Sequence, residues 1–188
     1  RNWPGPYAID LLPLVVADYT EVTVIDVGGG AATGLSQIAS SGIDTWVHYI
    51  LVETQAMCTA ISRFDAPIMA MPDLPTVVKP PVIINVASTL QYIEGWRHKL
   101  KQFITYSPEA IIISNTPVSE HLTYARCQTN GRNRRIPAWC FNQLELDNAL
   151  QGYRRRYYIE HNQSLRHKNA PAPSVQASMI YYPASSSR

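Results

Sequence analysis

The segment of the chain that says most about its fold reads Val22-Thr23-Val24-Ile25-Asp26-Val27-Gly28-Gly29-Gly30-Ala31-Ala32-Thr33-Gly34. A short β-branched run of this kind predicts a strand that is buried on both faces of a sheet. The glycines that follow allow a tight turn and let a ligand approach where a Cβ would block it. A helix from Gly34 to Ser41 places that turn at the carboxyl end of the strand, where doubly wound folds bind ligands.

Short apolar runs alternate with longer mixed segments along the rest of the chain, which predicts βαβ units and a mostly parallel sheet. The predicted fold class is α/β: a Rossmann-like, doubly wound, mostly parallel seven-stranded sheet with an antiparallel last strand and helices on both faces. We predict the seven strands at 22–27, 47–52, 68–70, 82–86, 110–114, 153–160 and 175–182. The predicted helices are at 9–19, 34–41, 55–63, 94–106 and 143–150.

Length and composition indicate one domain. The chain has 188 residues, of which 46% are hydrophobic, enough for a core of its own. We expect a single domain over residues 1–184, with a long loop at 116–138 and a frayed tail at 185–188. No apolar run approaches the roughly 18 residues of a membrane span, and the first residues lack the apolar stretch of a signal peptide, so we expect a cytoplasmic protein.

The cysteines and histidines show no metal-binding pattern. Cys58, Cys127 and Cys140 are an odd number without C-x-x-C spacing, which argues against a disulfide framework and a zinc site. The histidines, at 48, 98, 121, 161 and 167, have no ligand spacing. We therefore expect no metal.

The glycine segment also carries a binding motif. A dinucleotide-binding fingerprint needs a third glycine three residues after Gly30, and Thr33 stands there instead. Asp-x-Gly-x-Gly, formed by Asp26, Gly28 and Gly30, resembles the first motif of class I S-adenosylmethionine-dependent methyltransferases. The alternative is a plain turn, because glycine triplets after a strand also occur without a ligand.

Two acidic residues follow the next two predicted strands. Glu53 lies 23 residues beyond Gly30, a spacing at which an acidic side chain can accept hydrogen bonds from the ribose hydroxyls of an adenosine. Its alternative role is that of a carboxylate at a helix N-terminus. Asp73 follows the third strand, where methyltransferases of this class commonly present an Asp to the adenine, but Asp beside proline is also a common turn residue.

Three further segments resemble one little-studied family of class I methyltransferases that is often met among polysaccharide-biosynthesis genes. The matching motifs are Leu90-Gln91-Tyr92, Thr116-Pro117 and Pro137-Ala138-Trp139, and the likeness spans about residues 3–158. The chain departs from that family at Ser114-Asn115, where the family often has Asp-Arg, and at Ile136, where it often has Tyr. These departures indicate a different acceptor.

The resemblance implies methyl transfer from S-adenosylmethionine to a small molecule or a glycan, at oxygen. Its main requirement is alignment of the acceptor atom with the methyl group, at a distance of about 3 Å. It implies that the following residues surround the cofactor: Asp26, Gly28, Gly29, Gly30, Glu53, Asp73 and Ser88.

The sequence gives fewer indications of the residues that contact the methyl acceptor. A general base assists methylation of a hydroxyl, and the candidate is His121, with Tyr92 as a lining residue; His121 is otherwise an ordinary loop histidine. Trp139 can form a flat wall for a sugar face or belong to the core. Arg135 can pair with an anionic group of the acceptor or lie in solvent.

Two other functions remain open. The domain can be a cofactor-binding module that has lost catalysis. It can also methylate or bind nucleic acid through a basic segment, 126–168, although it lacks the Asn/Asp-Pro-Pro-Tyr/Trp motif and the Pro-Cys pair of the nucleic-acid methylases. The nine basic residues of that segment are Arg126, Arg132, Arg134, Arg135, Arg154, Arg155, Arg156, Arg166 and Lys168.

Overall fold

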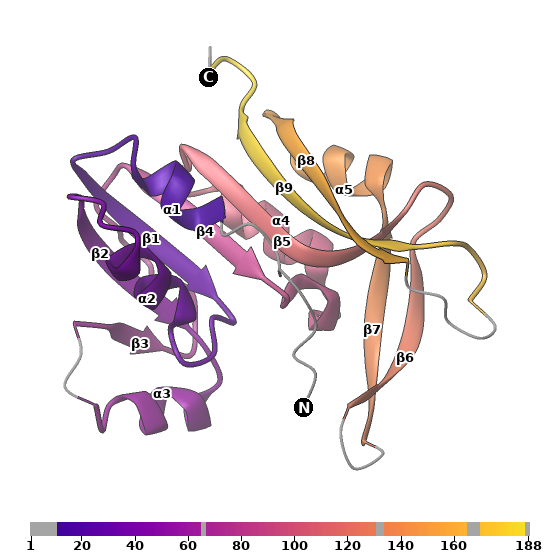
Figure 1. Cartoon of the computed structure of the whole chain (residues 1–188), viewed down its shortest axis with the longest axis horizontal. Coiled ribbons are helices and arrows are strands. Elements are labelled where there is room, and N and C mark those ends of the chain that lie inside the picture. The colour runs from indigo at the N-terminus through magenta and orange to yellow at the C-terminus, as the bar shows by residue number, and fades with distance from the viewer. Residues whose placement is uncertain (1–10, 65–66, 131–133, 165–169, 187–188) are drawn as a thin grey trace.

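The structure is a computed structural model that describes residues 11–64, 67–130, 134–164 and 170–186, and it shows an α/β fold (Figure 1). The strands in these ranges are β1 (Glu21–Val27), β2 (Trp46–Val52), β3 (Met69–Met71), β4 (Val82–Ala87), β5 (Ala110–Ser119), β6 (Tyr124–Asn130), β7 (Arg134–Asn142), β8 (Tyr153–Ser164) and β9 (Val175–Pro183). The helices are α1 (Leu11–Val16), α2 (Thr33–Ser40), α3 (Gln55–Ile61), α4 (Trp96–Ile104) and α5 (Gln143–Ala149), with a 3-10 turn, η1 (Leu90–Tyr92).

The strands form one mixed sheet. Its parallel part has the order β3-β2-β1-β4-β5, and β9 then pairs antiparallel with both β5 and β8. The predicted mostly parallel sheet with an antiparallel last strand is therefore confirmed. The seven predicted strands correspond to β1–β5, β8 and β9, and two strands that we did not predict extend the sheet on the path β5-β7-β6.

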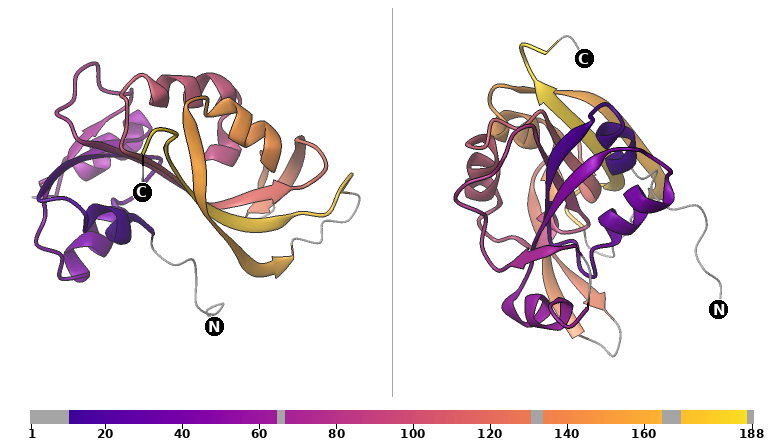
Figure 2. Two further views of the ribbon diagram at one scale, coloured as in Figure 1. Left: turned by 90° about the horizontal axis from the view of Figure 1, so that it is seen from above. Right: turned by 90° about the vertical axis from the view of Figure 1, so that its left-hand side faces the viewer.

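Successive residues of the central strands pack on opposite faces of the sheet, so each face has its own core. Val24 and Ile83 share a cluster with Leu12 of α1 and Ile38 of α2. Their neighbours in sequence share the other cluster, with α4 and α5; its members include Ile25, Ile84, Trp96, Leu100, Phe103 and Leu146. Figure 2 shows the helices on both sides of the sheet, which confirms that prediction.

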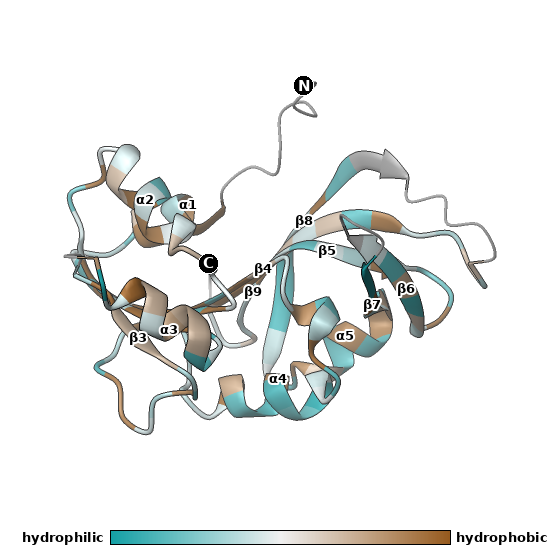
Figure 3. Cartoon of the chain, turned by 90° about the horizontal axis from the view of Figure 1, so that it is seen from below, coloured by the Kyte–Doolittle hydropathy of each residue, from teal (hydrophilic) through white to brown (hydrophobic). Residues whose placement is uncertain are grey.

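The predicted loop at 116–138 is wrong. β5 continues to Ser119, and β6 and β7 form an antiparallel hairpin that projects from the sheet (Figures 1 and 3). A hairpin needs apolar side chains only where it packs, and here Tyr124 and Cys140 are buried beside Ala172. Because most other positions of the hairpin are exposed or half-buried, they do not produce the apolar run that marks a buried strand.

Several predictions fall partly or wholly outside the described ranges. The predicted helix at 9–19 is seen as α1 from Leu11, and residues 9 and 10 are not described. The last two residues of the predicted tail, and Arg132, Arg166 and Lys168 of the basic segment, also lie outside. None of the helices in the described ranges is long and apolar enough to span a membrane.

Candidate functional site

The turn after β1 has room only for glycine at two successive positions. Gly28 has a φ of +71°, and a Cβ built there would lie 2.2 Å from Cγ2 of Thr89. A Cβ on Gly29 would lie 1.9 Å from Oδ2 of Asp26. The backbone of the turn can therefore lie directly against the sheet, and it leads into α2 through Ala32, which has a left-handed φ of 57°.

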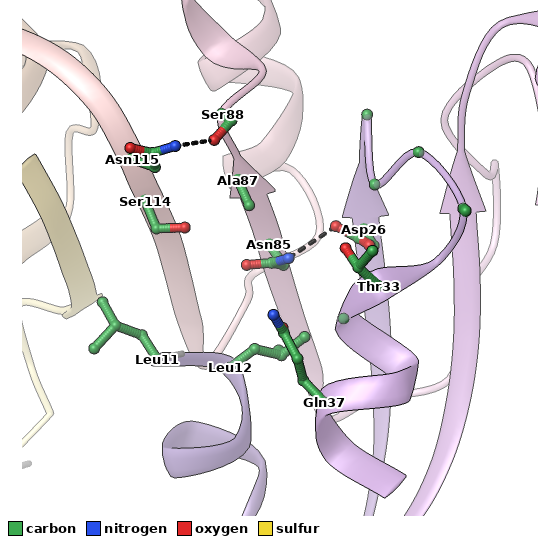
Figure 4. Close-up of a pocket in the computed structure, with 15 residues that line it drawn as sticks. Leu11, Leu12, Asp26, Thr33, Gln37, Asn85, Ala87, Ser88, Ser114 and Asn115 are labelled. Carbon is green, nitrogen blue, oxygen red and sulfur yellow. Dashed lines mark hydrogen bonds between the residues drawn. The ribbon is translucent and has the colours of Figure 1, made fainter. Parts of the chain in front are cut away.

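A cavity of about 500 Å³ lies at the carboxyl ends of β1 and β4, beside the middle of β5, and is also lined by α1 and α2 (Figure 4). The structure brings together five of the residues predicted to surround the cofactor, namely Asp26, Gly28, Gly29, Gly30 and Ser88. Three more lining residues, Ala31, Thr33 and Gly34, belong to the glycine segment. The sequence did not assign the remaining lining residues to the cofactor site: Leu11, Leu12, Gln37, Asn85, Ala87, Ser114 and Asn115.

The Asp26 carboxyl is part of the cavity lining and holds three strands together. Its Oδ1 accepts a hydrogen bond from Nδ2 of Asn85 on β4 at 2.8 Å, and its Oδ2 accepts one from the hydroxyl of Tyr49 on β2. Burial raises the pKa of Asp26 above its ordinary value of 3.8, while these two hydrogen bonds act in the opposite direction. Burial also raises the pKa of Tyr49, so this hydroxyl remains a donor.

Glu53 follows the last residue of β2 and reaches the glycine turn. Its Oε1 accepts a hydrogen bond from the backbone N–H of Gly30 at 3.1 Å, and its Oε2 accepts one from the N–H of Thr54 at 2.8 Å. An ionised carboxylate has about four acceptor positions, so these bonds leave some for a ligand. Although Glu53 does not itself line the cavity, it contacts a residue that does.

Ser88 follows the last residue of β4, and Asn115 lies in the middle of β5, just past the end of its parallel pairing with β4. Both are on the side of the cavity away from Asp26 (Figure 4). Nδ2 of Asn115 donates a hydrogen bond to Oγ of Ser88 at 2.5 Å. The sequence contained two signals for Asn115: it comes directly after the predicted strand at 110–114, and it departs from a family motif.

Asp73 lies in a different place from the other predicted cofactor residues. It is exposed, and it lines a groove of about 1010 Å³ beside β2 and β3, together with Trp46 and Val77. That groove and the glycine cavity have no lining residue in common.

The two proposed catalytic residues do not line the glycine cavity either. His121 is exposed and lines a crevice of about 170 Å³ with Glu160 and Ser174. Tyr92 is 41% exposed, and its hydroxyl donates a hydrogen bond to Oε1 of Gln128 at 3.1 Å.

The two predicted acceptor contacts lie on β7. Trp139 is half-buried and packs against the core cluster on the α4 and α5 face. Arg135 is exposed and lies opposite Thr129 of β6. Neither residue lines the glycine cavity.

The basic segment is divided between two parts of the sheet. Arg134 and Arg135 are exposed at the end of the β6–β7 hairpin, and Arg154 and Arg156 are exposed on β8. Arg155 is paired with Asp147 at 3.2 Å, so its charge is compensated. The described residues contain no group of three or more His, Cys, Asp or Glu that could hold a metal ion.

No protein-family model matches the sequence, and no curated protein matches it. Among solved structures, a SAM-dependent methyltransferase from Methanosarcina mazei aligns with a TM-score of 0.63 and 10% identity, over 90% of this chain and 96% of that one. An S-adenosylmethionine-dependent methyltransferase from Mesorhizobium loti aligns with a TM-score of 0.58 and 11% identity, over 90% and 95% of the two chains.

LepI, solved in complex with SAM, aligns with a TM-score of 0.58 and 13% identity over 89% of this chain. The alignment spans only 44% of LepI, and another neighbour with the same coverage is described as a pericyclic reaction enzyme. At these identities the comparisons establish the fold alone. This chain has the Rossmann-like fold that the SAM-dependent methyltransferases of Methanosarcina mazei and Mesorhizobium loti share.

Proposed function

We propose that this chain is an S-adenosylmethionine-dependent methyltransferase. The observation that carries the proposal is the contact between Glu53 and the glycine turn, in which a carboxylate at the end of β2 hydrogen-bonds the Gly30 N–H at 3.1 Å. This contact puts an acceptor for ribose hydroxyls beside a backbone turn that can lie against a nucleoside. A plain turn would not require a carboxylate at that point.

The residues at the turn fit an adenosine ligand in two respects. Gly30 has a φ of +58°, and among the described residues no atom beyond its chain neighbours lies within 4 Å of the Cβ position, so that side of the turn is open. Glu53 is held by two backbone N–H groups, which fixes its carboxylate before a ligand arrives. Such preorganisation lowers the ordering cost of binding.

A nicotinamide dinucleotide fits less well. Its fingerprint places a third glycine three residues after Gly30, where the helix must pack closely on the strand. Thr33 occupies that position and begins α2. The helix instead packs closely on the sheet one residue later, at Gly34, where a Cβ would lie 2.6 Å from the Tyr49 hydroxyl.

In the proposed reaction the acceptor atom bonds the methyl carbon as the carbon–sulfur bond breaks, S-adenosylhomocysteine leaves, and water takes up the proton of the acceptor. We further propose that the acceptor is a small molecule or a glycan that is methylated at oxygen. The support is the chemistry of the cavity, whose lining includes the neutral polar side chains of Thr33, Gln37 and Ser114. Such groups pair with hydroxyls.

The first experiment is calorimetric titration of the wild-type protein with S-adenosylmethionine, and separately with NADH. We expect binding of S-adenosylmethionine only. No heat with S-adenosylmethionine, or preferential binding of NADH, would contradict the proposal. Release of S-adenosylhomocysteine on incubation with a panel of sugars then distinguishes an enzyme from a binding module that has lost catalysis.

A further inference from the structure

Two residues that line the cavity have a left-handed backbone conformation, which residues other than glycine rarely adopt. Ser88 has a φ of 55° and Asn115 a φ of 50°, and they follow the ends of β4 and of the apolar part of β5. A left-handed φ is strained for residues other than glycine, and it persists where the surroundings hold it. Residues of this kind are concentrated at functional sites.

The backbone of Ser88 is held on both sides. Its N–H donates to the carbonyl of Ser114 at 2.9 Å, and its carbonyl accepts a hydrogen bond from Nε2 of Gln91, also at 2.9 Å. Gln91 is only 4% exposed. The Gln of the Leu90-Gln91-Tyr92 motif therefore fixes the conformation of a cavity residue.

The backbone of Asn115 is held in the same way, by β9. Its N–H donates to Oγ of Ser178 at 3.0 Å, and its carbonyl accepts a hydrogen bond from Nε2 of Gln176 at 2.6 Å. The pairing of β5 with β9 shifts register between Ile113 and Thr116, so Asn115 lies in a bulge. Bulges next to binding sites redirect a side chain, and here the Asn115 side chain points to Ser88.

The side chains of Ser88 and Asn115 form a hydrogen bond whose direction is defined. Nδ2 of Asn115 donates to Oγ of Ser88 at 2.5 Å (Figure 4). A hydroxyl has one proton and two acceptor positions, so the Ser88 proton is not used in this bond. Among the described residues Ser88 Oγ has no other hydrogen-bond partner, and its proton is available to the cavity.

We propose that Asn115 is a positioning residue that acts through Ser88. Its amide holds the Ser88 hydroxyl so that this hydroxyl donates a hydrogen bond to a carboxylate at the amino-acid end of the bound nucleoside. The inference rests on the proposed function, which puts the adenosine at Glu53 and Gly30. The rest of the ligand then extends along the cavity toward β4 and β5, where no Lys or Arg lines the wall in the described ranges.

The test compares S-adenosylhomocysteine, which carries the carboxylate, with 5′-methylthioadenosine, which lacks the amino-acid end. Calorimetry measures the Kd of both ligands for the wild type, Ser88→Gly, Asn115→Gly and the double variant. Glycine adopts a positive φ without cost, so these variants remove side chains and leave the backbone unstrained.

Each single variant is expected to raise the Kd for S-adenosylhomocysteine about 10-fold, the effect of one hydrogen bond. The double variant is expected to bind as weakly as Ser88→Gly alone, because Asn115 acts through Ser88. The Kd for 5′-methylthioadenosine stays unchanged, which also reports that each variant is folded.

A conservative variant checks the direction of the hydrogen bond between Asn115 and Ser88. Asn115→Asp keeps the size of the side chain and its tolerance of a left-handed φ, but its carboxylate accepts the Ser88 proton. We expect it to bind S-adenosylhomocysteine at least as weakly as Ser88→Gly does.

Three outcomes would overturn the inference and leave the proposed function standing. The variants could lose the same affinity for both ligands, they could bind S-adenosylhomocysteine as tightly as the wild type, or the effects of the two substitutions on its binding free energy could add in the double variant. A wild-type protein that binds neither ligand would instead overturn the proposed function.

Discussion

Glu53 and Gly30 are 23 residues apart in sequence, and the Oε1 of Glu53 accepts the Gly30 N–H at 3.1 Å. The bond joins the carboxyl end of β2 to the turn that follows β1. In a parallel sheet these two ends lie side by side, so the fold itself brings the carboxylate to the glycines. The position of a ribose at this site would thus be fixed by two adjacent strands.

The first prediction concerns Glu53. Glu53→Ala is expected to raise the Kd for S-adenosylmethionine about 10- to 100-fold, because hydrogen bonds to a charged group contribute about 1.5–3 kcal/mol. Glu53→Gln is expected to lose less affinity for S-adenosylmethionine, since its amide oxygen can still accept a hydrogen bond from the Gly30 N–H. Calorimetry at one ionic strength measures both.

Asp73→Ala is the matched control, because Asp73 is an exposed carboxylate that lies in the groove beside β2 and β3. Its Kd for S-adenosylmethionine should match that of the wild type. If Asp73→Ala weakened S-adenosylmethionine binding as much as Glu53→Ala, Asp73 would contact the adenine as the sequence suggested. That result would contradict this placement of the ligand.

The second prediction compares two glycines with the same φ of +71°. Gly42→Ala introduces only backbone strain, because no atom of the described residues beyond its chain neighbours lies within 4 Å of its Cβ position. Gly28→Ala adds a clash with Thr89, and overpacking of this kind costs about 1–3 kcal/mol more. Urea unfolding of both variants measures the difference, and equal free energies of unfolding would show that the turn is not packed as described.

The third prediction concerns the pH dependence of stability. Burial raises the pKa of Asp26 above 3.8 in the folded protein, so the native state retains a proton that the unfolded chain has released. The contribution of Asp26 to stability is therefore complete below pH 3.8 and is lost as the pH rises through the raised pKa.

Asp26→Asn removes this titration and keeps an acceptor for Asn85. Its free energy of unfolding, minus that of the wild type, should increase with pH above 3.8. Urea unfolding from pH 3.5 to about pH 8 checks the sign, and a difference that stays flat or falls would mean that the pKa is not raised.

The fourth prediction separates the two interpretations of Trp139. Because this side chain is half-buried against the core cluster, Trp139→Ala is expected to cost about 2–3 kcal/mol of stability. The Kd for S-adenosylmethionine should not change, since Trp139 does not line the glycine cavity. A variant with wild-type stability would contradict the core interpretation and favour the acceptor wall.

The sequence predicted the parallel part of the sheet because strands buried on both faces need apolar side chains at every position. Val24 and Ile25 illustrate this, since each belongs to the core on a different face. The β6–β7 hairpin could not be found in this way. Arg126 and Gln128 are only half-buried there, and their polar side chains resemble those of a loop.

The site was predictable where it depends on local chain order. Gly28 and Ser88 follow strands directly, and the carboxyl ends of parallel strands meet at one edge. Asn115 was visible in the sequence as the residue after the predicted strand at 110–114 and as a departure from a family motif. Its orientation depends on a bulge and on hydrogen bonds from Gln176 and Ser178, more than 60 residues later, and no local pattern encodes that pairing.

The most direct measurement is a crystal structure of the protein in complex with S-adenosylhomocysteine. We expect the ribose hydroxyls to donate to the Glu53 carboxylate and the amino-acid end to lie in the cavity, within hydrogen-bond distance of Ser88. A ligand in the groove beside β2 and β3, or no bound ligand at millimolar concentration, would contradict this expectation.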